Sequence, residues 1–170
     1  TKAEYPNNAA HPVSVERIFL EAFNTLYERH ISPHVTLFYN SFECDLSLFI
    51  RKTQGRTQLE KWKHKLYTEY SDGEILGNTT LFVTELAITD LDKFIRFKLS
   101  DAMWQCLLFQ LMYMITVAQY HFPGFRHNDL KADNILVDVY IPKPKTHFVY
   151  TIFGKKYYVP DLGFRLKLWD

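Results

Sequence analysis

Apolar residues recur with helical spacing in two segments of the chain. At about residues 13–29 they follow one another three or four positions apart, which predicts an amphipathic helix with one buried face. At about residues 101–121 they surround the helix almost completely, and Ser100 is placed to cap its start. The longest apolar stretch, 103–120, is interrupted by glutamines. We therefore interpret this second segment as a buried core helix rather than a membrane span.

Shorter apolar and β-branched runs predict strands. Gly154 separates two of these runs and predicts a hairpin. A short amphipathic helix is expected at 90–97. Residues 51–73 are rich in Lys, Gln, Glu and Gly, and they read as a loop or exposed insertion with a short helix near 59–67. The expected strands are 35–42, 79–86, 134–139, 148–153, 155–159 and 164–169.

Composition limits the classes of function. The 170 residues are 47% hydrophobic and 16% aromatic, enough for one domain with a packed core. The formal net charge of +1 provides no general field for nucleic acid or an anionic membrane, so any phosphate site has to be local. Cys44 and Cys106 form neither a metal-ligand spacing nor a disulfide framework, which indicates a reduced, intracellular setting.

The segment with the richest chemistry lies between the core helix and the strand at 134–139. Residues 127–134 read His-Asn-Asp-Leu-Lys-Ala-Asp-Asn. The Asp129 carboxylate can accept the hydrogen bond of an attacking hydroxyl, and Lys131 can reach a phosphate being transferred. The Asn134 amide oxygen suits Mg²⁺, which prefers oxygen ligands. This spacing lets the side chains point into one cleft, as phosphoryl transfer requires.

Residues 127–134 resemble the catalytic loop of protein kinases, His-Arg-Asp-Leu-Lys-x-x-Asn. The resemblance implies an α+β fold of the two-lobed protein-kinase type. It also implies that Asp129 is the catalytic base, Lys131 the lysine that contacts phosphate and Asn134 a magnesium ligand. His127 would be a structural residue of the loop.

Two positions of this loop refine the resemblance. Lys131 is typical of serine/threonine kinases, whereas tyrosine kinases usually have other residues there. Asn128 replaces the usual arginine, which in the family pairs with a phosphorylated activation loop. We therefore expect activation by another route, with the catalytic aspartate retained.

Residues 164–169 resemble the strand that leads to the kinase Asp-Phe-Gly motif, and Asp170 would then be the second magnesium ligand. Residues 161–163, Asp-Leu-Gly, have a similar form. We favour Asp170 because an apolar strand delivers it, whereas Asp161 follows Pro160 in a predicted loop.

The chain upstream resembles the adenine-binding strand and hinge of kinases. Thr84 would be the gatekeeper, and Glu85 and Ala87 would offer backbone hydrogen bonds to the purine. The helix at 13–29 resembles the one that supplies the glutamate of the Lys–Glu ion pair. Glu16 is the favoured residue, with Glu21 as the alternative.

Two expected parts are missing from the sequence. No glycine-rich loop precedes the first helix, since the first glycine is Gly55, and no Val-Ala-Ile-Lys strand is present. We expect an internal piece of a longer kinase that alone binds ATP poorly and catalyses little. Residues 1–86 would be the end of the N-terminal lobe, 87–89 the hinge and 90–170 the C-terminal lobe.

Within the family, the chain most resembles kinases of large DNA viruses. The expected reaction is ATP- and Mg²⁺-dependent transfer to Ser or Thr hydroxyls of proteins, with no nucleic-acid partner. A viral kinase would act in the cytoplasm of an infected cell or in the virion. A small-molecule kinase of the choline or aminoglycoside type is an alternative, although Lys131 argues against it. A non-catalytic pseudokinase scaffold is another, which the missing parts would favour.

Overall fold

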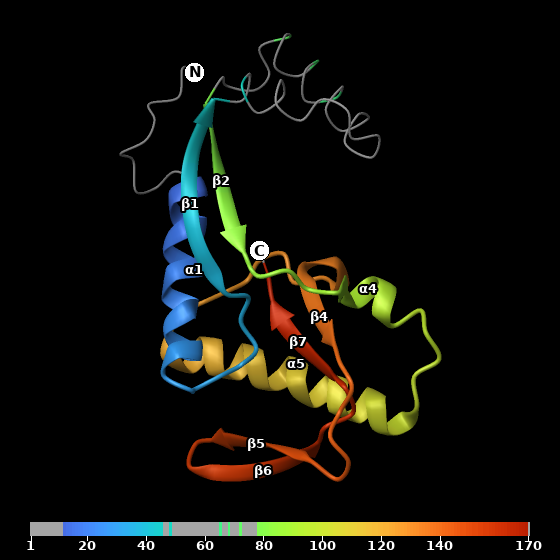
Figure 1. Cartoon of the computed structure of the whole chain (residues 1–170). Coiled ribbons are helices and arrows are strands. Elements are labelled where there is room, and N and C mark those ends of the chain that lie inside the picture. Colours follow the sequence, from blue (N-terminus) through green and yellow to red (C-terminus); the bar gives the residue numbers. More distant parts are fainter. Residues whose placement is uncertain are drawn as a thin grey trace. The chain divides into compact units, whose positions relative to one another are not determined.

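The computed structural model describes residues 12–45, 48, 65, 68, 72 and 78–169, which form a mixed α and β structure with small antiparallel sheets (Figure 1). The chain divides into two compact units, Thr1–Phe38 with Thr84–Asp170, and Tyr39–Val83. The described elements are α1 (Pro12–Glu28), β1 (Phe38–Asp45), β2 (Asn78–Thr84), β3 (Thr89–Asp90), α4 (Leu91–Phe94), α5 (Asp101–His121), the 3₁₀ turn η1 (Ala132–Asn134), β4 (Ile135–Val139), β5 (His147–Ile152), β6 (Lys155–Pro160) and β7 (Phe164–Leu168).

Helix α5 is the central helix of the first unit, as its pattern predicted. Ser100 caps it, since its hydroxyl accepts a hydrogen bond from the Met103 N–H at 3.3 Å. Buried side chains lie on several sides of the helix, including Leu107, Tyr113 and Val117. No helix in the described part of the chain combines the length and apolarity that a bilayer crossing requires.

Strands β3, β4 and β7 form an antiparallel sheet in that order. Val137 of β4 pairs with Leu166 of β7, and both side chains are 0% exposed. Because side chains alternate between the two faces of a strand, the neighbouring positions, among them Asp138 and Lys167, belong to the opposite face. The sheet therefore has an apolar face in the core and a face that carries charged groups.

The predicted hairpin is confirmed as β5 and β6, which pair from His147 with Pro160 to Ile152 with Lys155. The two residues between the strands, Phe153 and Gly154, have φ angles of 48° and 77°. Positive φ at both positions is typical of a type I′ turn, whose twist matches that of the strands.

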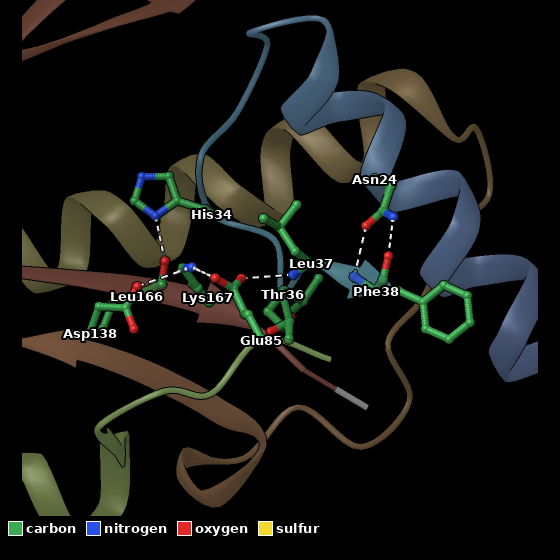
Figure 2. Close-up of polar contacts among 10 residues, drawn as sticks. Asn24, His34, Thr36, Leu37, Phe38, Glu85, Asp138, Leu166 and Lys167 are labelled. Atoms are coloured by element: carbon green, nitrogen blue, oxygen red, sulfur yellow. Dashed lines mark hydrogen bonds and ion pairs between the residues drawn. The ribbon is translucent and has the colours of Figure 1, made fainter. Parts of the chain in front are cut away.

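Helix α1 packs through its phenylalanines. The ring of Phe23 makes edge-on contacts with Phe122 and Phe125, with centroids 5.2 and 5.3 Å apart. Nearer the end of the helix, Asn24 donates to the Phe38 carbonyl at 2.6 Å and accepts from the Phe38 N–H at 2.9 Å (Figure 2). The segment that follows α1 is thus attached to the helix.

Strand β1 begins three residues later than the sequence predicted, at Phe38 rather than residue 35. The reason is that the preceding residues bond to the end of β7. The Leu168 N–H donates to the His34 carbonyl at 3.0 Å, and the Leu168 carbonyl accepts from both the N–H and the hydroxyl of Thr36. The predicted helix at 59–67 falls almost wholly outside the described residues.

In the second unit, β1 and β2 form a two-stranded sheet. The Thr80 hydroxyl donates to the Glu43 carboxylate across the pair at 2.8 Å. Strand β2 confirms the run predicted at 79–86, but it ends at Thr84.

His34 is fully buried where this segment meets β7 and β5. Its Nδ1 lies 2.7 Å from the Leu166 carbonyl oxygen (Figure 2) and its Nε2 lies 3.0 Å from the Tyr150 hydroxyl. A carbonyl only accepts hydrogen bonds, so the proton is on Nδ1 and the Tyr150 hydroxyl donates to Nε2.

Candidate functional site

The loop between α5 and β4 is fixed at both ends. After α5, the Phe125 N–H donates to the Phe122 carbonyl at 2.9 Å, and both rings pack on Phe23 of α1. Before β4, the Asn134 N–H donates to the Lys131 carbonyl at 3.1 Å within η1. These contacts fix the backbone at both ends of the loop.

Asp129, Lys131 and Asn134 converge in this loop. Lys131 Nζ lies 2.9 Å from Asp129 Oδ2. The Asn134 side-chain nitrogen, Nδ2, donates to both the carbonyl and Oδ2 of Asp129, each at 3.0 Å. The fold thus brings together the three residues that the sequence had singled out.

The three side chains differ in their access to solvent. The side chains of Asp129 and Lys131 are 64% and 50% exposed, whereas Asn134 is buried. The hydrogen bond from Lys131 lowers the pKa of the Asp129 carboxyl below its ordinary value, and its charge and the Asn134 amide act in the same direction. Asp129 is therefore an accessible carboxylate, held in place by a buried amide.

The metal-binding potential of Asn134 follows from these hydrogen bonds. Nδ2 donates both of them, and no group among the described residues donates to Oδ1. The free amide oxygen beside the Asp129 carboxylate fits a hard cation such as Mg²⁺. Within the described ranges, no three His, Cys, Asp or Glu side chains gather as metal ligands.

Asn128 forms the sharpest turn of the loop. Its φ is 60°, and the Asp129 N–H donates to the His127 carbonyl at 2.8 Å, which closes a three-residue γ-turn. Asparagine enters this left-handed region more readily than most residues. Asn128, at the position where protein kinases usually have arginine, is therefore well suited to the turn that precedes Asp129.

His127 attaches the loop to the end of β7. Its Nε2 lies 3.2 Å from the Trp169 carbonyl oxygen, and the Trp169 N–H donates to the Asn134 carbonyl at 3.3 Å. Among the described residues, the buried His127 Nδ1 has no hydrogen-bond partner. Asp170, the predicted second magnesium ligand, follows Trp169 and lies outside the described residues.

The Asp161 carboxylate is hydrogen-bonded within the turn that precedes β7. It accepts from the Tyr140 hydroxyl at 2.9 Å and from the Gly163 N–H at 3.1 Å. Burial and this hydrogen bond raise the pKa of Tyr140. At Gly163, where φ is 83°, an added Cβ would lie 2.7 Å from the Tyr140 carbonyl oxygen. The Asp-Leu-Gly stretch thus closes the turn into β7.

Glu16 and Glu21 have different surroundings on α1. Glu16 is half-buried and lines a pocket of about 360 Å³ together with Thr36, His127 and Trp169. Glu21 is exposed and lies 3.9 Å from the exposed Arg17 on the same helix. The structure therefore places Glu16, rather than Glu21, beside the loop.

Thr84 ends β2, and Glu85 and Ala87 follow it in a segment that is neither helix nor strand. The Glu85 N–H donates to the Leu37 carbonyl at 2.8 Å. Its carboxylate accepts from the Leu37 N–H at 2.7 Å through Oε1 and pairs with Lys167 through Oε2 (Figure 2). The sequence had indicated only a backbone role for Glu85, and this role of its side chain was not predicted.

Lys167 was also missed. Its side chain is 6% exposed, and its ammonium contacts both Glu85 and, at 3.0 Å, Asp138 (Figure 2). The alternation of apolar and basic residues at 164–169 was the available signal, because it places Lys167 on the face opposite the core. Nothing in the local sequence indicated that its two partners are 82 and 29 positions away.

The chain is similar to a protein of Acanthamoeba polyphaga mimivirus that bears the name "Putative serine/threonine-protein kinase R400". The two are 30% identical over 175 residues, which cover 96% of this chain and 37% of that protein. The chain therefore spans little more than a third of the length of its relative. No protein-family model matches the chain. The similarity indicates a kinase-like relationship.

Proposed function

We propose that this chain belongs to an ATP-dependent serine/threonine protein kinase with the two-lobed kinase fold, and that residues 127–134 are its catalytic loop. The observation that supports this most directly is the convergence of a carboxylate, an ammonium and an amide at Asp129, Lys131 and Asn134. The similarity to a viral protein named as a kinase supports the same reaction.

Asp129 would orient the attacking hydroxyl. An aspartate carboxyl is ionised at neutral pH, and Lys131 lowers the pKa of Asp129 further. Its exposure leaves room for a substrate. The hydroxyl of Ser or Thr donates a hydrogen bond to this carboxylate, attacks the γ-phosphorus and displaces ADP. Protein substrates, rather than choline-like small molecules, are favoured by the lysine at position 131.

Lys131, and a magnesium ion held by Asn134, would offset the negative charge of the phosphates. The Lys131 ammonium is half-exposed, so it can turn from Asp129 toward the transferring group. Asn134 Oδ1, with Asp170, would hold Mg²⁺, whose charge offsets that of the phosphate oxygens when it is bound. We assign purine recognition to Thr84 and the backbone of Glu85 and Ala87, and the ion-pair role to Glu16.

The test is transfer of the γ-phosphate of ATP by the full-length protein to a basic protein and, separately, to choline. Asp129→Ala is expected to reduce transfer to protein by about 10²- to 10⁴-fold, which is the usual range for losing such a group. Asp133→Asn, in the same loop, is the matched control and should retain activity. Circular dichroism should show that both variants fold. Retained activity in a folded Asp129→Ala protein would remove Asp129 from this role, and a preference for choline would replace the substrate class.

A further inference from the structure

Lys167 is a buried cation with two anionic partners. Its side chain reaches Glu85, in the segment after β2, and Asp138, on the neighbouring strand β4 (Figure 2). Glu85 also holds the Leu37 N–H through its second oxygen. One ammonium thereby connects four parts of the first unit, namely the segment after α1, the segment after β2, and strands β4 and β7.

Stability alone explains this network poorly. The side chains of Lys167 and Glu85 are largely removed from water, at 6% and 15% exposure, which is costly for charged groups. Apolar side chains of similar volume often give equal or greater stability at such sites. Ion pairs differ from apolar contacts in being directional, so they specify one arrangement of the segments that they join. The network is therefore better suited to fixing the relative positions of these segments than to strengthening the core.

The segments that it joins are those assigned to the two ends of the nucleotide. Glu85 and Ala87 form the proposed purine-binding segment, which continues into β3 and its pairing with β4. Lys167 lies two residues before Trp169, which bonds to both His127 and Asn134 of the catalytic loop. The hydrogen bonds that assemble Asp129, Lys131 and Asn134 do not involve Lys167.

We infer that Lys167, through its ion pairs with Glu85 and Asp138, is a positioning residue that holds the 85–87 segment in register with the catalytic loop, and so determines affinity for the purine part of ATP. This inference rests on the proposed function and adds to it a residue that touches no substrate. It predicts that losing Lys167 weakens base recognition and leaves the phosphate site intact.

The test compares two ligands of the full-length protein, MgATP and magnesium tripolyphosphate, by titration calorimetry. In Lys167→Met, the Kd for MgATP should rise about tenfold, while the Kd for tripolyphosphate changes less than about twofold. In kinetics, KM for ATP should rise with little change in kcat. Lys155→Met, at the exposed hairpin turn, is the matched control and should change none of these values.

The outcomes separate the inference from the function on which it rests. If the wild-type protein binds no MgATP, the proposed function fails, and the inference fails with it. If the wild type binds and Lys167→Met weakens both ligands equally, or neither, the positioning role alone is overturned. Should Lys167→Met not fold, Glu85→Gln keeps the shape and reduces the charge. It should raise the Kd for MgATP about threefold with tripolyphosphate unchanged, and an equal change for both ligands would again overturn the role.

Discussion

The protonation of His34 couples the stability of this fold to pH. Burial is the largest cause that lowers its pKa, from 6.5 to about 4, and the nearby charges of Arg165 and Lys167 act in the same direction. The hydrogen bond to the Leu166 carbonyl opposes them, because it favours a protonated ring. The neutral ring, with Nδ1 donating and Nε2 accepting, satisfies both of its neighbours.

The size of the effect follows from linkage. Because the pKa is lower in the folded state, the unfolded chain binds more protons between pH 6.5 and 4, and stability falls as pH falls through that window. A difference of this size corresponds to about 3 kcal/mol in total, at about 1.4 kcal/mol per pKa unit. About 2 kcal/mol of it should be lost between pH 7 and pH 5.

Two measurements test this reasoning. Histidine NMR should give an imidazole with an apparent pKa near 4 and the proton on Nδ1 at neutral pH. In urea unfolding, His34→Asn, which keeps a donor but does not titrate, should lose about 2 kcal/mol less than wild type between pH 7 and pH 5. Other titrating groups are common to both proteins and cancel in the comparison. An identical pH dependence, or an imidazole that titrates near 6.5, would refute the account.

Three positions with positive φ yield further predictions. If the proposed phosphoryl transfer holds, Asn128→Gly should retain it, because glycine adopts a φ of 60° freely, whereas Asn128→Val should lower it by about tenfold. Equal rates for the two variants in a steady-state assay would show that the turn does not place Asp129. Gly163→Ala should destabilise the fold by at least about 2 kcal/mol in urea unfolding, through both positive φ and its contact with Tyr140. Gly154→Ala, with a φ of 77° and open space around it, should lower the free energy of unfolding by only about 1 kcal/mol. Equal losses for the Gly154 and Gly163 variants would show that the close approach of Gly163 to Tyr140 is not rigid.

Features set by neighbouring residues could be predicted from the sequence. Ser100 as a cap and the apolar residues on all sides of the following segment predicted a helix at about 101–121, which matches the bounds of α5. Gly154 between two apolar runs gave the hairpin. The loop residues 129, 131 and 134 are close enough in sequence for their spacing to bring them together, and they do meet.

Features set by distant partners could not be predicted. The start of β1 is displaced because residues 34–36 bond to Leu168, more than 130 positions away. The burial of His34 depends on Leu166 and Tyr150, and that of Lys167 on Glu85. A local pattern shows that a side chain is polar, but it does not show which remote group will accept its hydrogen bond.

The contact between Lys131 and Asp129 has a consequence for the order of events at the loop. The Lys131 ammonium is the largest cause that lowers the pKa of the Asp129 carboxyl below its ordinary value. A phosphate that draws the ammonium away also returns proton affinity to the carboxylate. In the proposed reaction, Asp129 would thus become somewhat more basic once a donor nucleotide has arrived and drawn Lys131 away.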